Sequence, residues 1–165
     1  MHHTDDPLAR SQEETRSAFA NRALIYAHIL DELTAEIGRE RAVEVMRRAI
    51  YKRGLEVAEK YRAAAEAGRL AEVGRIFCEG SPCGGELFHP AIEELADDSL
   101  TLTMYSCPLV EAWREAGLAD SEIDTLCEVA AAVDEGTFEG AGLHVEIRER
   151  LGHPGDERCL LIIRR

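Results

Sequence analysis

The spacing of apolar residues changes near the middle of the chain, and this change constrains the fold more than any other feature. From about residue 11 to 37, apolar side chains recur at the spacing of one amphipathic helix, which Gly38 would end. A second helix follows, with one face formed by Val43, Met46, Ile50, Val57 and Tyr61. After Gly68 a shorter segment is also helical in pattern. The first half therefore predicts helices, the first two of which form a hairpin.

Beyond Cys78 the pattern is that of loops and strands. The stretch CEGSPCGGELFHP is rich in glycine and proline and predicts a loop with tight turns. SLTLTMYS then alternates strictly between apolar and polar residues, as a strand covered on one face does. Near the C-terminus, LHVEI and CLLII predict two closing strands around a GHPGDE loop.

Two helices are expected between these strands. Pro108 suits the first position of a helix capped by Cys107, and this helix should end at Gly117. Ser121 and Asp124 resemble a capping box that opens a further helix to Gly136, before a turn with the sequence GTFEGAG. The sum is an α+β fold, an N-terminal helical hairpin packed with a small antiparallel sheet interrupted by two helices. We expect a single domain over residues 1–165, with residues 1–10 as a disordered tail.

Composition narrows the classes of partner. The formal net charge is −13, and this excess of acid disfavours binding to nucleic acid or to anionic lipid. No apolar run approaches the ~20 residues of a membrane span, and the first residues do not resemble a secretory signal, so a cytoplasmic location is expected. The five cysteines are an odd number and include no C-x-x-C pair. They are expected to be reduced thiols.

Cys107 is the first candidate for chemistry. It lies where a strand gives way to a helix, and unpaired backbone N–H groups at a helix start favour a thiolate. By strand alternation it should share a side with Thr101, Thr103 and Tyr105. The alternative is a small apolar residue packed under Trp113.

Asp134 and Glu139 are candidate acids. Asp134 lies two helical turns after Cys127, on a helix face that borders the apolar stripe. It also falls in the last turn of the predicted helix, where a negative charge is unfavourable because of the helix dipole. The alternative is a carboxylate paired with an arginine at the edge of the domain. Glu139 is flanked by glycines, which either let the backbone approach a ligand or simply form a turn.

A metal site is possible in principle but is not predicted. Cysteine, histidine and aspartate are zinc ligands, so Cys107, Cys127, Asp134 and His144 are the residues that would converge on a metal. Their long, irregular separations do not predict zinc, and His144 falls on the polar face of its strand. No cofactor is therefore expected.

Three segments of the second half share a recognisable pattern. CPLVEAWREAGL, CEVAAAVDEGTFEGAGL and the closing CLLIIRR resemble the L-2-amino-thiazoline-4-carboxylic acid hydrolase family, and the upstream stretch YAHILDELTAEIGRERAVEVMRRAIYKRG is similar to it too. The resemblance implies a hydrolase acting on C–N bonds in cyclic amidines, in which water opens a small cyclic amidine acid to an N-carbamoyl amino acid. It implies a small-molecule substrate.

The resemblance carries over Cys107, Cys127, Asp134 and Glu139 as the recognisable polar and thiol residues of the family, without dividing roles among them. The roles that follow are our own expectation from the chemistry of these side chains. Cys107, Asp134 and Glu139 are expected to be catalytic, Cys107 as a nucleophile and the two acids as proton donors or acceptors. Tyr105, Cys127 and Trp113 are expected to bind substrate. Two alternatives stay open: a non-catalytic small-molecule-binding or sensory domain, and a metal-binding or thiol-redox protein that uses Cys107, Cys127 and Cys159. A homo-oligomer in which the N-terminal hairpin exchanges between subunits is also compatible with the pattern.

Overall fold

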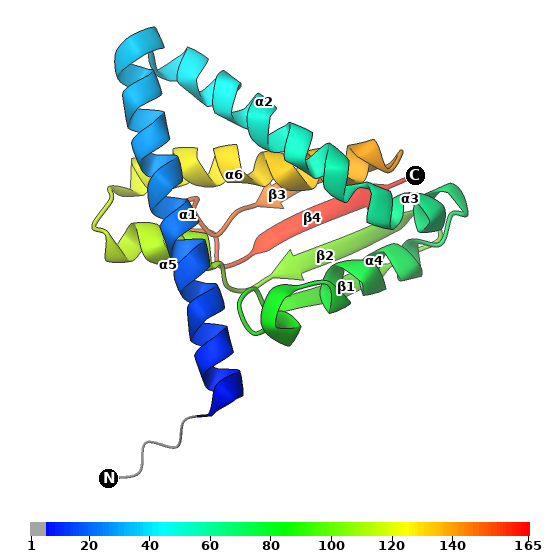
Figure 1. Ribbon diagram of the computed structural model, residues 1–165. Helices are drawn as coiled ribbons and strands as arrows, with labels where there is room; N and C mark the ends of the chain where they lie inside the picture. The colour runs from blue at the N-terminus through cyan, green and yellow to red at the C-terminus, as the bar shows by residue number, and fades with distance from the viewer. Residues whose placement is uncertain (1–5) are drawn as a thin grey trace.

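The computed structural model describes residues 6–165, which form an α+β fold with helices before a four-stranded antiparallel sheet (Figure 1). The elements in chain order are α1 (Pro7–Ile37), α2 (Arg39–Val57), α3 (Glu59–Glu66), α4 (Leu70–Glu79), the short 3₁₀ helix η1 (Pro82–Gly85), β1 (Pro90–Leu95), β2 (Ser99–Met104), α5 (Pro108–Glu115), α6 (Asp120–Gly140), β3 (His144–Glu149) and β4 (Cys159–Arg164). The predicted fold class is confirmed. Within residues 6–165, no helix combines the length and the apolar character needed to traverse a lipid bilayer.

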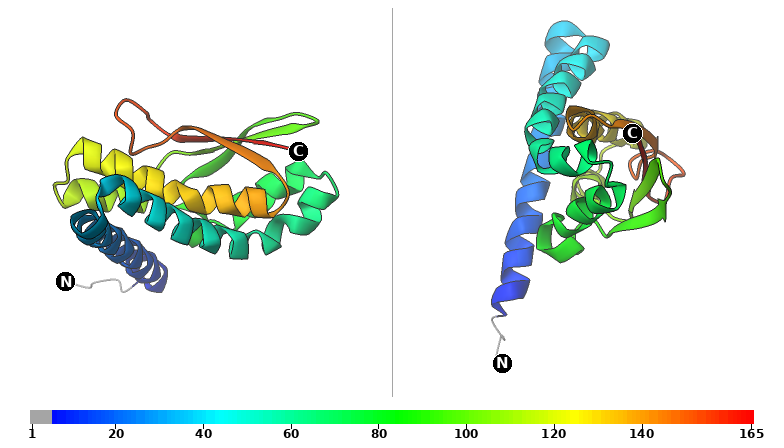
Figure 2. Two further views of the ribbon diagram at one scale, coloured as in Figure 1. Left: turned by 90° about the horizontal axis from the view of Figure 1, so that it is seen from above. Right: turned by 90° about the vertical axis from the view of Figure 1, so that its right-hand side faces the viewer.

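The sheet has the order β1-β2-β4-β3, and the helices lie on one of its faces (Figure 2). The three predicted strands are confirmed, and they are joined by β1, for which the sequence pattern predicts no strand: Pro90 ends the predicted loop, and residues 91–95 have no assignment. β1 begins at Pro90 and reads PAIEEL, without alternation, and most of its residues are exposed. It is an edge strand, where a leading proline is tolerated and pairing with β2 supplies the backbone hydrogen bonds.

The N-terminal helix is longer than expected. Asp6 caps it, because its side chain accepts a hydrogen bond from the backbone N–H of Leu8 at 3.0 Å. The expected disordered tail is therefore wrong from Pro7 onward, and residues 1–5 lie outside the described part of the chain. The predicted stop at Gly38 is confirmed, since this glycine has a φ of 81° and begins the turn into α2.

The last helix, α6, differs from expectation at both ends. It begins at Asp120 and not at a Ser121 cap, because the Glu122 carboxylate accepts the Ala119 N–H at 3.1 Å and stabilises an earlier start. It also continues through the predicted GTFEGAG turn to Gly140. The glycines serve helix packing there: a Cβ on Gly136 would lie 2.2 Å from the carbonyl oxygen of Tyr51. The backbones of α2 and α6 are thus in direct contact.

A glycine of α2 contributes to the same close contact between the two helices. A Cβ on Gly54 of α2 would lie 2.3 Å from the carbonyl oxygen of Val133. Two helices whose facing residues lack side chains can approach closely enough for their backbones to touch. Val133 immediately precedes Asp134 on α6, so this close contact fixes the segment that carries a predicted site residue.

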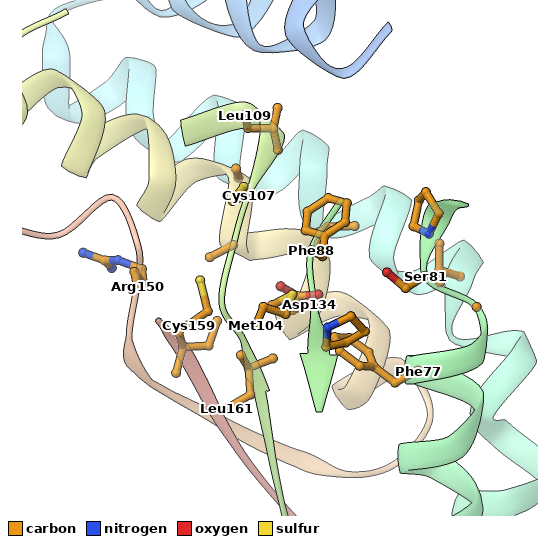
Figure 3. A pocket seen from close by; sticks show the side chains of 18 of the residues that line it. Phe77, Ser81, Phe88, Met104, Cys107, Leu109, Asp134, Arg150, Cys159 and Leu161 are labelled. Atoms are coloured by element: carbon orange, nitrogen blue, oxygen red, sulfur yellow. The ribbon is translucent and has the colours of Figure 1, made fainter. Parts of the chain in front are cut away.

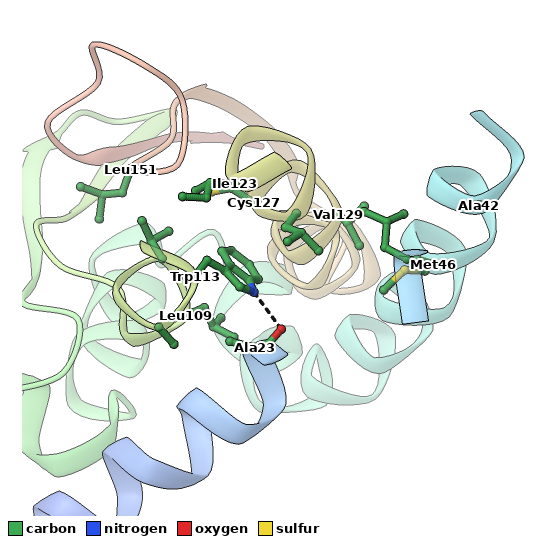
Figure 4. Packing of buried hydrophobic residues seen from close by; sticks show 13 residues of the cluster. Ala23, Ala42, Met46, Leu109, Trp113, Ile123, Cys127, Val129 and Leu151 are labelled. Atoms are coloured by element: carbon green, nitrogen blue, oxygen red, sulfur yellow. Dashed lines mark hydrogen bonds between the residues drawn. The ribbon is translucent and has the colours of Figure 1, made fainter. Parts of the chain in front are cut away.

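The buried side chains form two clusters. The first joins α1, α2, α5 and α6 around Trp113, which is fully buried and whose indole N–H donates to the carbonyl of Ala23 at 2.7 Å (Figure 4). The second lies between the sheet and α3, α4 and the end of α6, and includes Leu100, Leu102 and Phe138. The leucines of β2 face this cluster, as their alternation predicts.

Candidate active site

A largely apolar pocket of about 310 Å³ lies where the two core clusters meet. Its walls come from α6, from the inner face of β2 and β4, and from the segment that joins α4 to β1 (Figure 3). Phe77, Phe88, Met104 and Leu161 are among the apolar side chains that line it. Pockets of this kind, apolar with a few polar groups, are the usual form of small-molecule sites.

Asp134 presents its carboxyl group to this pocket from α6 (Figure 3). Burial raises the pKa of Asp134 from its ordinary value of 3.8 to about 7, and the nearby charge of Glu135 adds to this effect. Among residues 6–165 no hydrogen bond or ion pair is formed by the Asp134 side chain, so the alternative of an arginine partner does not apply there. The group is therefore divided between acid and base near neutral pH.

Tyr61 supplies a second polar group beside Asp134. Its ring is 7% exposed and stacks edge-on against Phe138, with ring centroids 5.6 Å apart. Burial, followed by the negative charge of Asp134, raises the pKa of Tyr61 to about 12. The hydroxyl therefore keeps its proton at neutral pH and remains a hydrogen-bond donor at the pocket wall.

Cys107 also lines the pocket, and it begins α5 as predicted, with Pro108 in the first helical position. Burial raises the pKa of the Cys107 thiol to about 12, which outweighs the opposite influence of the backbone N–H groups of Leu109 and Val110. The expectation that the helix start favours a thiolate is therefore wrong. The thiol is neutral, and it also packs against the cluster around Trp113.

The predicted strand parity does not extend to Cys107. Cys107 lines the pocket together with Met104, whereas Tyr105 is 52% exposed and lies outside the pocket. The parity is lost because β2 ends at Met104, and the backbone N–H groups of Tyr105 and Ser106 then both bond to the carbonyl of Phe88. The chain bends at these two residues, and alternation holds only within a regular strand.

Three thiols gather at one end of the pocket. Cys107, Cys127 and Cys159 all line it, and the side chains of Cys107 and Cys159 point toward the same region (Figure 3). Burial raises the pKa of Cys127 and of Cys159, so all three are neutral thiols. In the described part of the chain, no three histidine, cysteine, aspartate or glutamate side chains are placed so that they could hold a metal ion. His144 is exposed on β3 and does not reach the pocket.

Other predicted residues are placed differently. Cys127 and Asp134 share the pocket-facing side of α6, as the helical spacing predicts. Glu139 is exposed near the end of α6 and accepts a hydrogen bond from the Tyr51 hydroxyl at 2.7 Å, on the side facing α2. Trp113 lies in the first core cluster and Tyr105 on the outer side of the sheet, so neither lines the pocket.

Several pocket residues were not singled out from the sequence as site residues. They are Arg22, Lys60, Tyr61, Phe77, Phe88 and Arg150. Only Tyr61 carried a usable signal, because a tyrosine on an otherwise apolar helix face needs a partner for its hydroxyl. The others come from elements far apart in the chain. Arg150 borders the pocket, but its guanidinium is directed away from it and donates to Asp124 at 2.8 Å (Figure 3).

Comparison with known proteins bears on the identity of this site. No curated protein matches the chain. A family model described as L-2-amino-thiazoline-4-carboxylic acid hydrolase matches residues 18–162, a span that includes α2 to α6, all of the sheet except the end of β4, and every pocket residue discussed above. The chain therefore belongs to the L-2-amino-thiazoline-4-carboxylic acid hydrolase family.

Proposed function

We propose that the protein hydrolyses a cyclic amidine acid of the 2-amino-thiazoline-4-carboxylate type, and that Asp134 is the acid–base group of the reaction. The family match supports the class of reaction. The observation that carries the assignment is the Asp134 carboxyl, which lines the pocket with a pKa of about 7. A group with a pKa near the working pH transfers protons in both directions with the greatest efficiency.

The product defines which bond breaks. Water adds to the amidine carbon, and an N-carbamoyl product keeps both nitrogens on that carbon. The ring bond that breaks is then the carbon–sulfur bond, in contrast to the C–N cleavage that we expected from the resemblance. Attack takes place on the amidinium form, whose ring nitrogen already carries a proton, so the electron pair of the C=N bond returns to that nitrogen as a neutral N–H. Asp134 as carboxylate accepts a proton from the attacking water and delivers it to the sulfur as the carbon–sulfur bond breaks. The proton of the new hydroxyl then passes to Asp134 and on to solvent as the carbonyl forms. The protonated Tyr61 hydroxyl lines the same pocket and is a hydrogen-bond donor available to the water-derived oxygen that becomes the carbonyl.

Cys107 offers an alternative nucleophile that would form a covalent amidine adduct. Its pKa of about 12 argues against this path, because only a minute fraction of the thiol is ionised near neutral pH. Direct attack by water needs no such ionisation. We therefore assign Cys107 to the pocket wall and not to bond formation.

The experiment is an assay of thiol release from 2-amino-thiazoline-4-carboxylate, since ring opening frees the ring sulfur. For the wild type we expect kcat to fall as the pH drops below about 7, because the base form of Asp134 is lost. Asp134→Asn should lower kcat by about 100-fold or more and remove this pH limb. Asp97→Asn, a change at an exposed acid in the turn between β1 and β2, is the matched control and should behave as wild type.

The same assay separates the other readings. Cys107→Ser should retain kcat within a few-fold, whereas a loss as large as that of Asp134→Asn would favour the covalent path. Absence of thiol release from this substrate and from close cyclic amidine acids would overturn the proposal. Ligand binding without turnover would then point to the non-catalytic binding domain.

A further inference from the structure

The pocket is larger and more apolar than a small polar ring requires. Its volume of about 310 Å³ reaches the range of ~300–1,000 Å³ that is typical for drug-sized ligands. A five-membered ring with one amino and one carboxylate group would leave much of it to water. Water in the space between Phe77, Phe88, Met104 and Leu161 would find few hydrogen-bond partners. An apolar substituent on the ligand would fill that space.

Two cations border the same pocket. Arg22 on α1 and Lys60 on α3 both line it and are both exposed, which places them at its rim. Within residues 6–165 neither forms an ion pair, although the chain has a net charge of −13 and most of its arginines pair with acids. Arg150 differs, since its charge is already paired with Asp124. The rim therefore has unpaired positive charge.

Arg22 is connected to the pocket by a series of aromatic contacts. Its guanidinium carbon lies 4.4 Å from the centroid of the Phe19 ring. The Phe19 ring in turn packs edge-on against Phe88, with centroids 5.4 Å apart, and Phe88 lines the pocket. The cation is thus held against an aromatic pair that is continuous with the apolar wall.

We infer that the ligand of this pocket is an amphipathic acid, with its carboxylate between Arg22 and Lys60 and a sizeable apolar group in the interior. This inference rests on the proposed function and narrows it: the substrate is then a cyclic amidine acid that carries an apolar substituent. It also stands alone as a statement about binding, so it is tested without turnover.

The test is calorimetric titration of the full chain with straight-chain carboxylates from butanoate to decanoate at about pH 6, where these acids are ionised and Asp134 is mostly protonated. Affinity should rise about fourfold for each added methylene until the pocket is full. Ala131 lines the pocket, so Ala131→Leu should make the rise stop at a shorter chain. Affinity that does not depend on chain length would overturn the apolar half of the inference.

The proposed position of the ligand carboxylate is tested with its own control variants. The double variant Arg22→Gln with Lys60→Gln should weaken octanoate about tenfold and leave octan-1-ol unchanged. The pair Arg48→Gln with Lys52→Gln removes the same charge from exposed positions outside the pocket and should affect neither ligand. Equal weakening by both pairs, or octanol binding as tightly as octanoate, would overturn the assignment of the rim.

The two proposals fail separately. If chain-length dependence is seen but no cyclic amidine is hydrolysed, the inference holds and the proposed function is wrong. If thiol release is observed but longer carboxylates bind no better than short ones, the proposed function holds and the inference is wrong.

Discussion

Replacing Asp134 by asparagine is expected to stabilise the folded protein above neutral pH. Burial raises the pKa of Asp134 from 3.8 to about 7, so the unfolded chain releases this proton at lower pH than the folded one does. Ionisation therefore favours unfolding as pH rises from about 4 to about 7, and the penalty is constant above that range. At about 1.4 kcal/mol per pH unit, the full penalty is about 4 kcal/mol. Asparagine carries no such charge.

The assay is urea unfolding followed by the fluorescence of the single tryptophan, Trp113. The free energy of unfolding of Asp134→Asn should exceed that of the wild type by up to about 4 kcal/mol at about pH 8, and by less than about 2 kcal/mol at about pH 5. Asp97→Asn, at an exposed acid, should show no such difference. A gain of the same size at both pH values, or a loss at about pH 8, would refute the raised pKa and with it the acid–base assignment.

Three further substitutions or modifications are tested by simple measurements. Gly136→Ala would place a Cβ 2.2 Å from the Tyr51 carbonyl oxygen, and the resulting overlap should lower the free energy of unfolding by at least about 2 kcal/mol in urea titrations. Trp113→Phe would leave the carbonyl of Ala23 without its donor at 2.7 Å, so the free energy of unfolding should fall by about 1–3 kcal/mol, as measured by circular dichroism melting. An unchanged melting curve would contradict the buried hydrogen bond. Alkylation of Cys107 by iodoacetamide at about pH 8 should be at least ~100-fold slower in the native protein than in urea, as read by mass spectrometry.

The regular elements could be predicted from local patterns alone. The helical spacing before Gly38 and the alternation in β2 each depend on neighbouring residues, and both are confirmed. β1 was missed because its residues are mostly exposed, and an edge strand is defined by its partner β2 and not by its own pattern. The sequence predicts a helix end at Gly136, because local pattern does not reveal that the backbone of Tyr51 packs against this position and makes a glycine necessary.

The candidate site could be predicted only where a single helix or strand carries its residues. Asp134 and Cys127 face one side because a single helix carries both, and the structure brings both to the pocket. The protonation of Cys107 was predicted in the wrong direction, because the helix start is visible in the sequence whereas the depth of burial is not. Arg22 and Lys60 come from the N-terminal helices, and only the tertiary fold brings them to the rim of the pocket that Asp134 also lines.

The backbone contact between α2 and α6 has a consequence for how the pocket can adapt. With Gly54 and Gly136 in the contact, the two helices have no side chains there that could change rotamer and let one slide past the other. They should move as a single rigid wall that keeps Asp134 at a fixed depth. Adjustment to ligands of different shape then falls to the opposite wall, where Met104 is an unbranched side chain with several rotatable bonds. Diversity of substrate among proteins with this helix pair should accordingly follow changes in the sheet and in the segment after α4, while the carboxyl group at the position of Asp134 keeps its place.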